Sequence, residues 1–269
     1  MSGGGRILAI GGHEFNSRRG NGAICDLIVD LADSAHPRIC LLPTASGDPA
    51  DQIVSFRRAF GERGCEPSAI SLFRLGTSPV DLRAQLLAQD AIYVGGGSMV
   101  NLLAIWRAHG LDRLLRECID EEILICGQSA GAMCWFEGGI TCSSGRPAPV
   151  GGLGVLPGSA CVHFRAEPER RDRFIRGIRE QELPSGLGLE DQTAALFEGG
   201  ALAQSFSGRE EAAVWEVSGE GERRLPSRPI SDPQPAIDSL SPEILELRRT
   251  LASRAPRRRS RVSRVGRPH

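Results

Sequence analysis

The chain has 269 residues, of which 41% are hydrophobic and 5% aromatic, and its formal net charge is -1. This length suits one α/β domain with its own core, and the near-zero charge excludes a global attraction to nucleic acid or anionic lipid. All 32 basic residues are arginine, which excludes a Schiff-base lysine, a P-loop lysine and a Ser-Lys dyad.

Strands and helices are predicted to alternate through the first half of the chain, as in a parallel sheet with helices on both faces. Short apolar runs predict strands near residues 6–10, 38–42, 69–73 and 90–94. Helices are predicted near residues 22–35, 49–64 and 80–88, and two more between residues 99 and 122 lead to the next strand.

The most informative stretch is 123–136, where an apolar strand runs into Gly127-Gln-Ser-Ala-Gly131 and then into a predicted helix. It fits the G-x-S-x-G nucleophile elbow in the strand, turn and helix context that this motif requires. Small residues around Ser129 let the strand and the helix approach each other closely. An ordinary Gly/Ser turn is the alternative, and the context favours a serine nucleophile.

The second half is predicted to complete the domain and to end in a tail. Residues 138–158 are Gly/Pro/Ser-rich and predict loops with one or two short strands; strands are expected over 159–164, 186–194 and within 195–217, and a charged helix over 167–182. Residues 1–225 form the predicted domain. The Pro/Arg-rich segment 226–269 holds ten arginines and four acidic residues, and we expect it to be a disordered, solvated tail. No nucleic-acid partner is expected, because nothing aromatic interleaves the arginines, and a contact of this tail with nucleic acid or a membrane is the alternative.

Eight scattered cysteines form no CxxC pair, and the five histidines show no metal-ligand spacing. We therefore predict reduced, mainly buried cysteines in a cytoplasmic protein that needs no metal and no cofactor. No stretch approaches the roughly 18 apolar residues of a membrane span, so no membrane contact is expected. The N-terminus leads straight into a strand, and we expect no signal peptide.

The glycine run Gly95-Gly-Gly-Ser98 follows the predicted strand at 90–94. Glycines at the carboxyl end of a parallel strand let backbone N–H groups face a ligand. An oxyanion hole is built from such a group together with the N–H after the nucleophile, so Gly97 and Ala130 are the candidates. A glycine turn that merely starts the next helix is the alternative.

The base is chosen by elimination. A serine needs a base within hydrogen-bond reach, and after Ser129 only His163 and His269 remain, of which His269 ends the predicted tail. His163 is therefore the candidate base, and a core histidine on a strand is the alternative.

The position of the acid separates two folds. An α/β-hydrolase triad runs serine, acid, histidine, yet the only carboxylate between Ser129 and His163 is Glu137, so that fold is disfavoured. The best-placed acids are Glu190 and Asp191, which follow the histidine. Successive side chains on a strand point to opposite faces, so at most one of them is expected to face the base, and we favour Asp191. Both could instead be solvated strand ends.

Four segments together resemble the dipeptidase E and cyanophycinase-like family of serine peptidases: 95–107, 109–112, 129–137 and 161–167. The resemblance spans roughly residues 6–218. It implies a class I glutamine-amidotransferase-like fold, a three-layer α/β/α arrangement with a mostly parallel central sheet. It also implies Ser129 as nucleophile, His163 as base, Gly97 with Ala130 as the oxyanion hole, and an acid in the Gly-Leu-Glu-Asp segment.

The chain departs from the family pattern at two places. Some members have been assigned an aspartate in the loop after the elbow helix, where this chain reads Thr141-Cys-Ser-Ser144, and this departure strengthens Asp191 or Glu190. Ser98 stands where the family often has asparagine, so a contact near the oxyanion site differs. Gly96 and Ser98 are candidate substrate contacts.

The resemblance implies a small peptide with an aspartyl residue at the scissile bond as substrate, because dipeptidase E takes an N-terminal aspartate and cyanophycinases cut aspartyl-arginine linkages. An acidic side chain calls for arginine, and Arg165, Arg170 and Arg171 follow His163. Surface charges on a helix are the alternative for these three. An esterase, an amidotransferase subunit and a non-catalytic binding protein remain as rival functions, and a homodimer is an open possibility.

Overall fold

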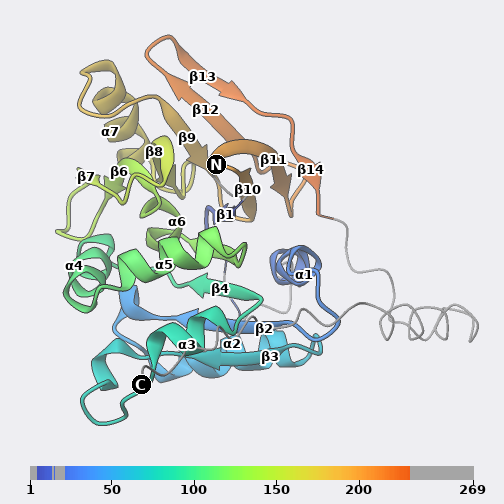
Figure 1. Cartoon of the computed structure of the whole chain (residues 1–269). Helices are drawn as coiled ribbons and strands as arrows, with labels where there is room; N and C mark the ends of the chain where they lie inside the picture. The colour runs from blue at the N-terminus through green and yellow to red at the C-terminus, as the bar shows by residue number, and fades with distance from the viewer. Residues whose placement is uncertain (1–4, 14, 16–21, 231–269) are drawn as a thin grey trace, which may run out of the picture. The chain divides into compact units, whose positions relative to one another are not determined.

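Two β-sheets organise the residues that the computed structural model describes, which are 5–13, 15 and 22–230 (Figure 1). The eight-stranded sheet has the order β14-β11-β10-β1-β5-β4-β2-β3. The six-stranded sheet has the order β13-β12-β9-β8-β6-β7.

The eight-stranded sheet is mostly parallel. Its parallel strands are β1 (Arg6–Ile10), β2 (Arg38–Leu42), β3 (Glu66–Ala69), β4 (Ala91–Val94) and β5 (Leu124–Gln128). On the other side of β1 follow β10 (Thr193–Glu198), which is antiparallel to β1, then β11 (Ala201–Ser207) and β14 (Arg228–Pro229).

Helices cover both faces of this sheet because its central strands are apolar on both sides. Leu8, Ile10 and Tyr93 face α1 (Gly22–Leu31) and α2 (Ala50–Gly61) in one core cluster. Ile92 and Ile125 face the other way, into a cluster that contains residues of four helices: α3 (Leu82–Leu87), α4 (Met99–His109), α5 (Leu111–Asp120) and α6 (Ala130–Met133). The 3-10 turns η1 (Thr44–Ser46) and η2 (Leu72–Arg74) follow β2 and β3.

The six-stranded sheet begins directly after α6. Its strands are β6 (Phe136–Thr141), β7 (Ala148–Gly151), β8 (Leu156–Val162), β9 (Gly186–Leu189), β12 (Val214–Ser218) and β13 (Gly221–Arg224). One face contributes Val162 and Leu189 to the core that contains Ile125 of the eight-stranded sheet. The opposite face packs through Cys161 against Phe174 of α7 (Pro168–Arg179).

The predicted α/β fold class is confirmed by the structural neighbours reported below, and most first-half elements lie close to their predicted bounds. Several local predictions are wrong. The strand predicted near residues 69–73 ends at Ala69, and residues 72–74 form a 3-10 turn. The elbow helix ends at Met133, so Phe136 starts a strand instead of continuing the helix. The segment 138–158 carries strand residues of β6, β7 and β8, in a second sheet that the prediction of one central sheet did not include. The strand predicted over 186–194 is two strands, broken between Leu189 and Thr193.

The predicted domain boundary at residue 225 falls inside the folded part. Ser205 donates to the Pro226 carbonyl over 2.7 Å, and Phe206 pairs with Arg228 between β11 and β14. The Ile230 N–H donates to the Ser207 carbonyl, so the packed chain reaches at least residue 230. The remainder of the predicted tail, 231–269, lies outside the described residues. Among the described helices, none has the length and apolar character needed to cross a membrane.

Candidate active site

Ser129 lies in a sharp turn at the carboxyl end of β5, directly before α6. Its backbone has φ 51° and ψ -116°, a strained conformation for a residue with a side chain. The turn depends on small neighbours, because a Cβ on Gly127 would lie 2.0 Å from the Gly131 carbonyl oxygen, and a Cβ on Gly131 would lie 2.4 Å from the Val94 carbonyl oxygen. The strand and the helix therefore approach each other closely, and Ser129 occupies the sharp turn between them.

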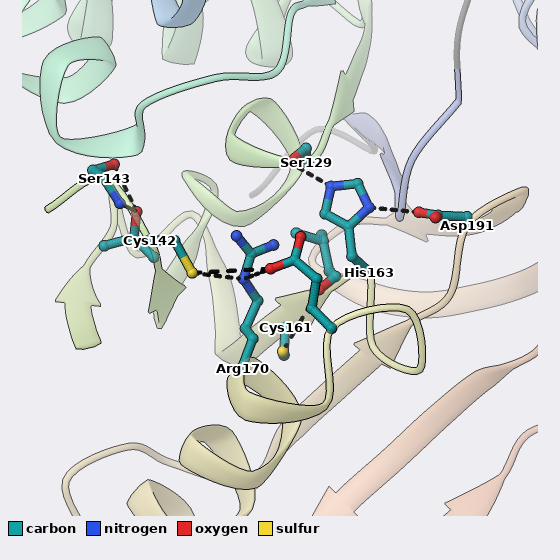
Figure 2. Close-up of polar contacts among 10 residues, drawn as sticks. Ser129, Cys142, Ser143, Cys161, His163, Arg170 and Asp191 are labelled. Carbon is teal, nitrogen blue, oxygen red and sulfur yellow. Dashed lines mark hydrogen bonds and ion pairs between the residues drawn. The ribbon is translucent and has the colours of Figure 1, made fainter. Parts of the chain in front are cut away.

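His163 and Asp191 complete a hydrogen-bonded chain with Ser129, which Figure 2 shows as two dashed contacts in line. His163 Nε2 lies 3.1 Å from Ser129 Oγ, and His163 Nδ1 lies 2.5 Å from Asp191 Oδ1. The hydrogen bond from His163 is the main reason why the pKa of Asp191 is lowered, and Asp191 is thus an anion that accepts from Nδ1. Nδ1–H then leaves Nε2 as the acceptor for the serine proton.

A strand was predicted to include His163, but His163 lies outside it. It follows the last residue of β8 and has φ 52°, which turns its side chain out of the strand direction. Asp191 likewise lies in the β9–β10 connection and not on a strand end, and the next residue, Gln192, has φ 67°.

Gly12 fits against both partners of this pair. A Cβ on Gly12 would lie 2.4 Å from Asp191 Oδ1 and 2.6 Å from His163 Cε1. The Gly12 carbonyl accepts from the Gln192 N–H over 2.8 Å, which holds the Asp191 loop against the end of β1. The sequence analysis did not single out Gly12, although the Gly11-Gly12 pair at a strand end was a usable signal.

Glu190, the alternative acid, faces away from His163. Its Oε1 accepts from Trp215 Nε1 over 2.7 Å and pairs with Arg165 Nε over 3.4 Å, while its Oε2 accepts from the Ala213 N–H over 3.3 Å. The structure therefore brings Asp191, and not Glu190, to the histidine.

The three arginines proposed for substrate binding have different surroundings. Arg165 lies over the Trp215 ring at 4.3 Å and pairs with Glu190. Arg171 donates to Glu222 over 2.7 Å. Arg165 and Arg171 thus both make contacts within the protein, and their role in substrate binding stays a prediction.

Arg170 is buried, with 8% of its surface exposed. Its Nε lies 3.2 Å from Glu167 Oε2 and 3.4 Å from Cys142 Sγ, and Figure 2 shows it reaching from α7 to Cys142 near the catalytic pair. Its Nη1 is buried and has no hydrogen-bond partner in the described part of the chain. Arg170 therefore keeps donor capacity that the protein itself does not use.

The glycine loop after β4 lies beside the elbow. A Cβ on Gly96 would be 3.2 Å from Ser129 Cβ. Gly97 has φ 139°, and a Cβ added to it would lie only 2.3 Å from the Ala45 carbonyl oxygen. In the described part of the chain, the N–H groups of Gly97 and Ala130 donate to no other backbone carbonyl. Ser98 caps α4, because its hydroxyl accepts from the Asn101 N–H over 3.2 Å. Its contact with substrate stays a prediction.

Cys142 contacts Arg170, but no cysteine contacts Ser129, His163 or Asp191 in the hydrogen bonds of the described residues. All eight are free and seven are buried. Burial raises the pKa of Cys25 to about 12 and of Cys40 to about 11, so these thiols stay protonated and unreactive. Among the described residues, no cluster of His, Cys, Asp or Glu could hold a metal ion.

A second polar chain lies next to the nucleophile and was missed at the sequence level. His13 Nε2 is 2.6 Å from the Tyr93 hydroxyl, which donates to Gln128 Oε1 over 2.8 Å. The usable signal was Gln128 itself, a polar residue that ends an otherwise apolar strand and immediately precedes the serine.

The described residues form a two-sheet α/β fold with a serine in a strained turn after β5, and a family model identifies the class of protein. Residues 7–205 match the model described as Peptidase family S51. The chain belongs to this family of peptidases and is a hydrolase of the serine type.

Among curated proteins, an uncharacterized peptidase of Bacillus subtilis (strain 168) named YgaJ is 40% identical over 212 residues, which is 79% of this chain and 91% of that protein. A cyanophycinase of Synechococcus elongatus is 27% identical over 72% of this chain and 63% of its own length.

Two solved structures share the fold. A peptidase from an acI-B1 Actinobacterium has a TM-score of 0.63 and 18% identity, covering 84% of this chain and 96% of its own. A putative peptidase E protein from Listeria monocytogenes EGD-e has a TM-score of 0.55 and 16% identity, covering 83% of this chain and all of its own.

Proposed function

We propose that this peptidase hydrolyses small peptides with an aspartyl residue on the acyl side of the scissile bond, through a Ser129–His163–Asp191 triad and an acyl-enzyme. The observation that carries the proposal is the continuous hydrogen-bonded chain from Ser129 Oγ to the Asp191 carboxylate, with contacts of 3.1 and 2.5 Å. A strained serine at an elbow, a base in reach and an acid that orients the base together form the arrangement that activates a hydroxyl.

The chemistry follows from these atoms. His163 Nε2 takes the proton as Ser129 Oγ attacks the peptide carbonyl, and the anionic Asp191 stabilises the imidazolium through Nδ1–H. The N–H groups of Gly97 and Ala130 receive the oxyanion. His163 then gives its proton to the leaving amine, and it next activates a water molecule that releases the acid and restores the serine.

The aspartyl preference is supported by Arg170. A buried guanidinium with an unused Nη1 can pair with a substrate carboxylate in a charge-assisted hydrogen bond. Glu167 compensates part of the charge of Arg170, so the guanidinium keeps an anionic partner when no substrate is bound. The name of the Bacillus subtilis relative, a peptidase, agrees with a peptide bond as the target of this chain.

The test has two steps. Intact protein is treated with a fluorophosphonate and weighed by mass spectrometry, with Ser129→Ala and His163→Ala beside the wild type. A single adduct on the wild type that is absent from both variants supports an activated serine. A folded wild type that takes up no adduct and hydrolyses no peptide overturns the proposal.

The second step measures specificity with matched aspartyl and asparaginyl dipeptides. Arg170→Met should lower kcat/KM for the aspartyl peptide by about 10- to 100-fold and change the asparaginyl peptide little, because a hydrogen bond to a charged group contributes about 1.5–3 kcal/mol. Arg176→Met, an exposed arginine of the same helix, is the control. An equal loss of kcat/KM on both peptides would show that Arg170 does not distinguish the aspartyl carboxylate from the asparaginyl amide.

A further inference from the structure

Gln128 is placed to contact the substrate, although it belongs to no part of the triad. It is the last residue of β5, and it is partly exposed while the four strand residues before it are buried. Its side-chain oxygen is already engaged, since Oε1 accepts from the Tyr93 hydroxyl over 2.8 Å. No hydrogen bond from its Nε2 is found in the described part of the chain, so both amide protons are available.

Two buried residues, Tyr93 and His13, fix which end of the Gln128 amide is the oxygen and which is the nitrogen. Tyr93, the only tyrosine of the chain, is fully buried, and burial raises its pKa, so the phenol keeps its single proton. That proton goes to Gln128 Oε1, and the phenol oxygen therefore accepts from His13 Nε2–H over 2.6 Å. A fixed donor at Oε1 leaves Nε2 as the end of the amide that faces away from Tyr93.

The free end of the amide borders the space beside the nucleophile. A Cβ on Gly96 would lie 3.2 Å from Ser129 Cβ and 3.5 Å from Gln128 Nε2. Ser129 and the Gln128 amide therefore flank the same face of the glycine loop. An acyl group attached to Ser129 Oγ must occupy the volume next to this loop, within reach of the amide.

We infer that Gln128 is a specificity residue whose Nε2 donates a hydrogen bond to a side-chain oxygen of the acyl-side residue, and that Tyr93 and His13 are positioning residues for it. The inference rests on the peptidase function proposed above. The neutral Nε2–H group of Gln128 donates to a carboxylate oxygen and to an amide oxygen alike, whereas Arg170 distinguishes the two side chains by charge. Gln128 thus selects aspartyl and asparaginyl residues over the isosteric leucyl residue, because a bound leucyl side chain excludes water from the Nε2 donor and offers it no acceptor.

The test uses three dipeptides that differ only in an Asp, Asn or Leu acyl-side residue. Gln128→Met keeps the side-chain length and removes the donor, and it should lower the Asn-to-Leu ratio of kcat/KM by about 10-fold, the value of one buried hydrogen bond of roughly 1.4 kcal/mol. Gln128→Glu replaces the donor by a negative charge and should penalise the Asp peptide most. Gln85→Met, at an exposed position of α3, is the matched control.

Tyr93→Phe tests the positioning role. It frees the Gln128 amide to rotate, so the same ratio should fall by a smaller factor, about threefold, mostly through KM, and the change should vanish in a Gln128→Met background. A purely structural role would lower all three substrates and persist in the double variant. If Tyr93→Phe unfolds, the two Gln128 variants still decide the inference.

The outcomes separate the two proposals. If the wild type is labelled at Ser129 and cleaves aspartyl peptides while Gln128→Met keeps the wild-type Asn-to-Leu ratio, Gln128 is not a specificity residue and the peptidase proposal stands. Equal losses on all three peptides would also overturn the inference, since they indicate a contact with the substrate backbone. A wild type that is neither labelled nor active removes the proposed function together with this inference.

Discussion

Substituting Gly12 by alanine should disable the triad while the fold persists. The new methyl carbon would lie 2.6 Å from His163 Cε1 and 2.4 Å from Asp191 Oδ1. Carbon atoms make good contact at about 3.5–4.0 Å, so the imidazole must retreat by roughly 0.9 Å or more. The Ser129–His163 contact of 3.1 Å has little room for this, because hydrogen bonds of this kind end near 3.5 Å.

A displacement of about 1 Å in a catalytic group can cost on the order of 100-fold in rate, and we expect that loss in both fluorophosphonate labelling and peptide hydrolysis. Gly61→Ala is the matched control, because nothing lies within 4 Å of its added Cβ. The thermal unfolding midpoint and far-ultraviolet circular dichroism report the fold of each variant. A Gly12→Ala protein that labels at the wild-type rate would refute the close packing of Gly12 on the pair.

Three further predictions concern the same site. Asp191→Asn should lower kcat by about 10³- to 10⁴-fold, because the imidazole loses its tautomer and its counter-charge. The pKa of Asp191 is lowered in the folded state, so its contribution to stability is present above the unfolded value near 3.9 and is lost as pH falls through the folded value. Urea unfolding from pH 2 to 7 should therefore show the stability advantage of the wild type over Asp191→Asn shrinking toward acid, and a constant difference would contradict the assignment. Glu190→Gln should leave kcat nearly unchanged but cost about 1–3 kcal/mol of stability, because the ion pair with Arg165 is lost and the single amide oxygen can accept from only one of Trp215 Nε1–H and the Ala213 N–H. A loss of kcat as large as that of Asp191→Asn would make Glu190 the acid. Gly97→Ala should abolish fluorophosphonate labelling, because Gly97 has φ 139° and an added Cβ would lie 2.3 Å from the Ala45 carbonyl oxygen. A variant that is still labelled would show that this loop does not form the oxyanion hole.

The features that the sequence predicted well are those that a short local segment dictates. The turn around Ser129 needs small residues at 127 and 131, and those glycines stand in the sequence next to an apolar strand. The choice of His163 needed no geometry, because so few histidines follow the serine. Both conclusions depend on residue types and order, which the sequence shows directly.

The features that the sequence did not predict arise from backbone conformation and long-range packing. Glu190 and Asp191 were treated as neighbours on a strand, whereas a break after Leu189 and a φ of 67° at Gln192 set their directions. Trp135 and Phe136 continue an apolar run that suits a helix as well as a strand, and burial in the shared core decided for a strand at Phe136. The His13–Tyr93–Gln128 chain joins three separate segments, and no sequence spacing relates them.

The triad depends on how the two sheets pack. Ser129 follows β5 of the eight-stranded sheet, His163 follows β8 of the six-stranded sheet, and Asp191 lies in the connection that passes from β9 of one sheet to β10 of the other. The 3.1 Å contact between Ser129 and His163 therefore depends on how the two sheets are placed relative to each other. A core in which Val162 and Leu189 pack with Ile125 sets that placement. The chain order serine, histidine, acid follows from this arrangement, because the chain enters the second sheet after the nucleophile and supplies the acid only as it returns to the first. Packing of the second sheet through Val162 and Leu189 therefore fixes the position of His163 relative to Ser129.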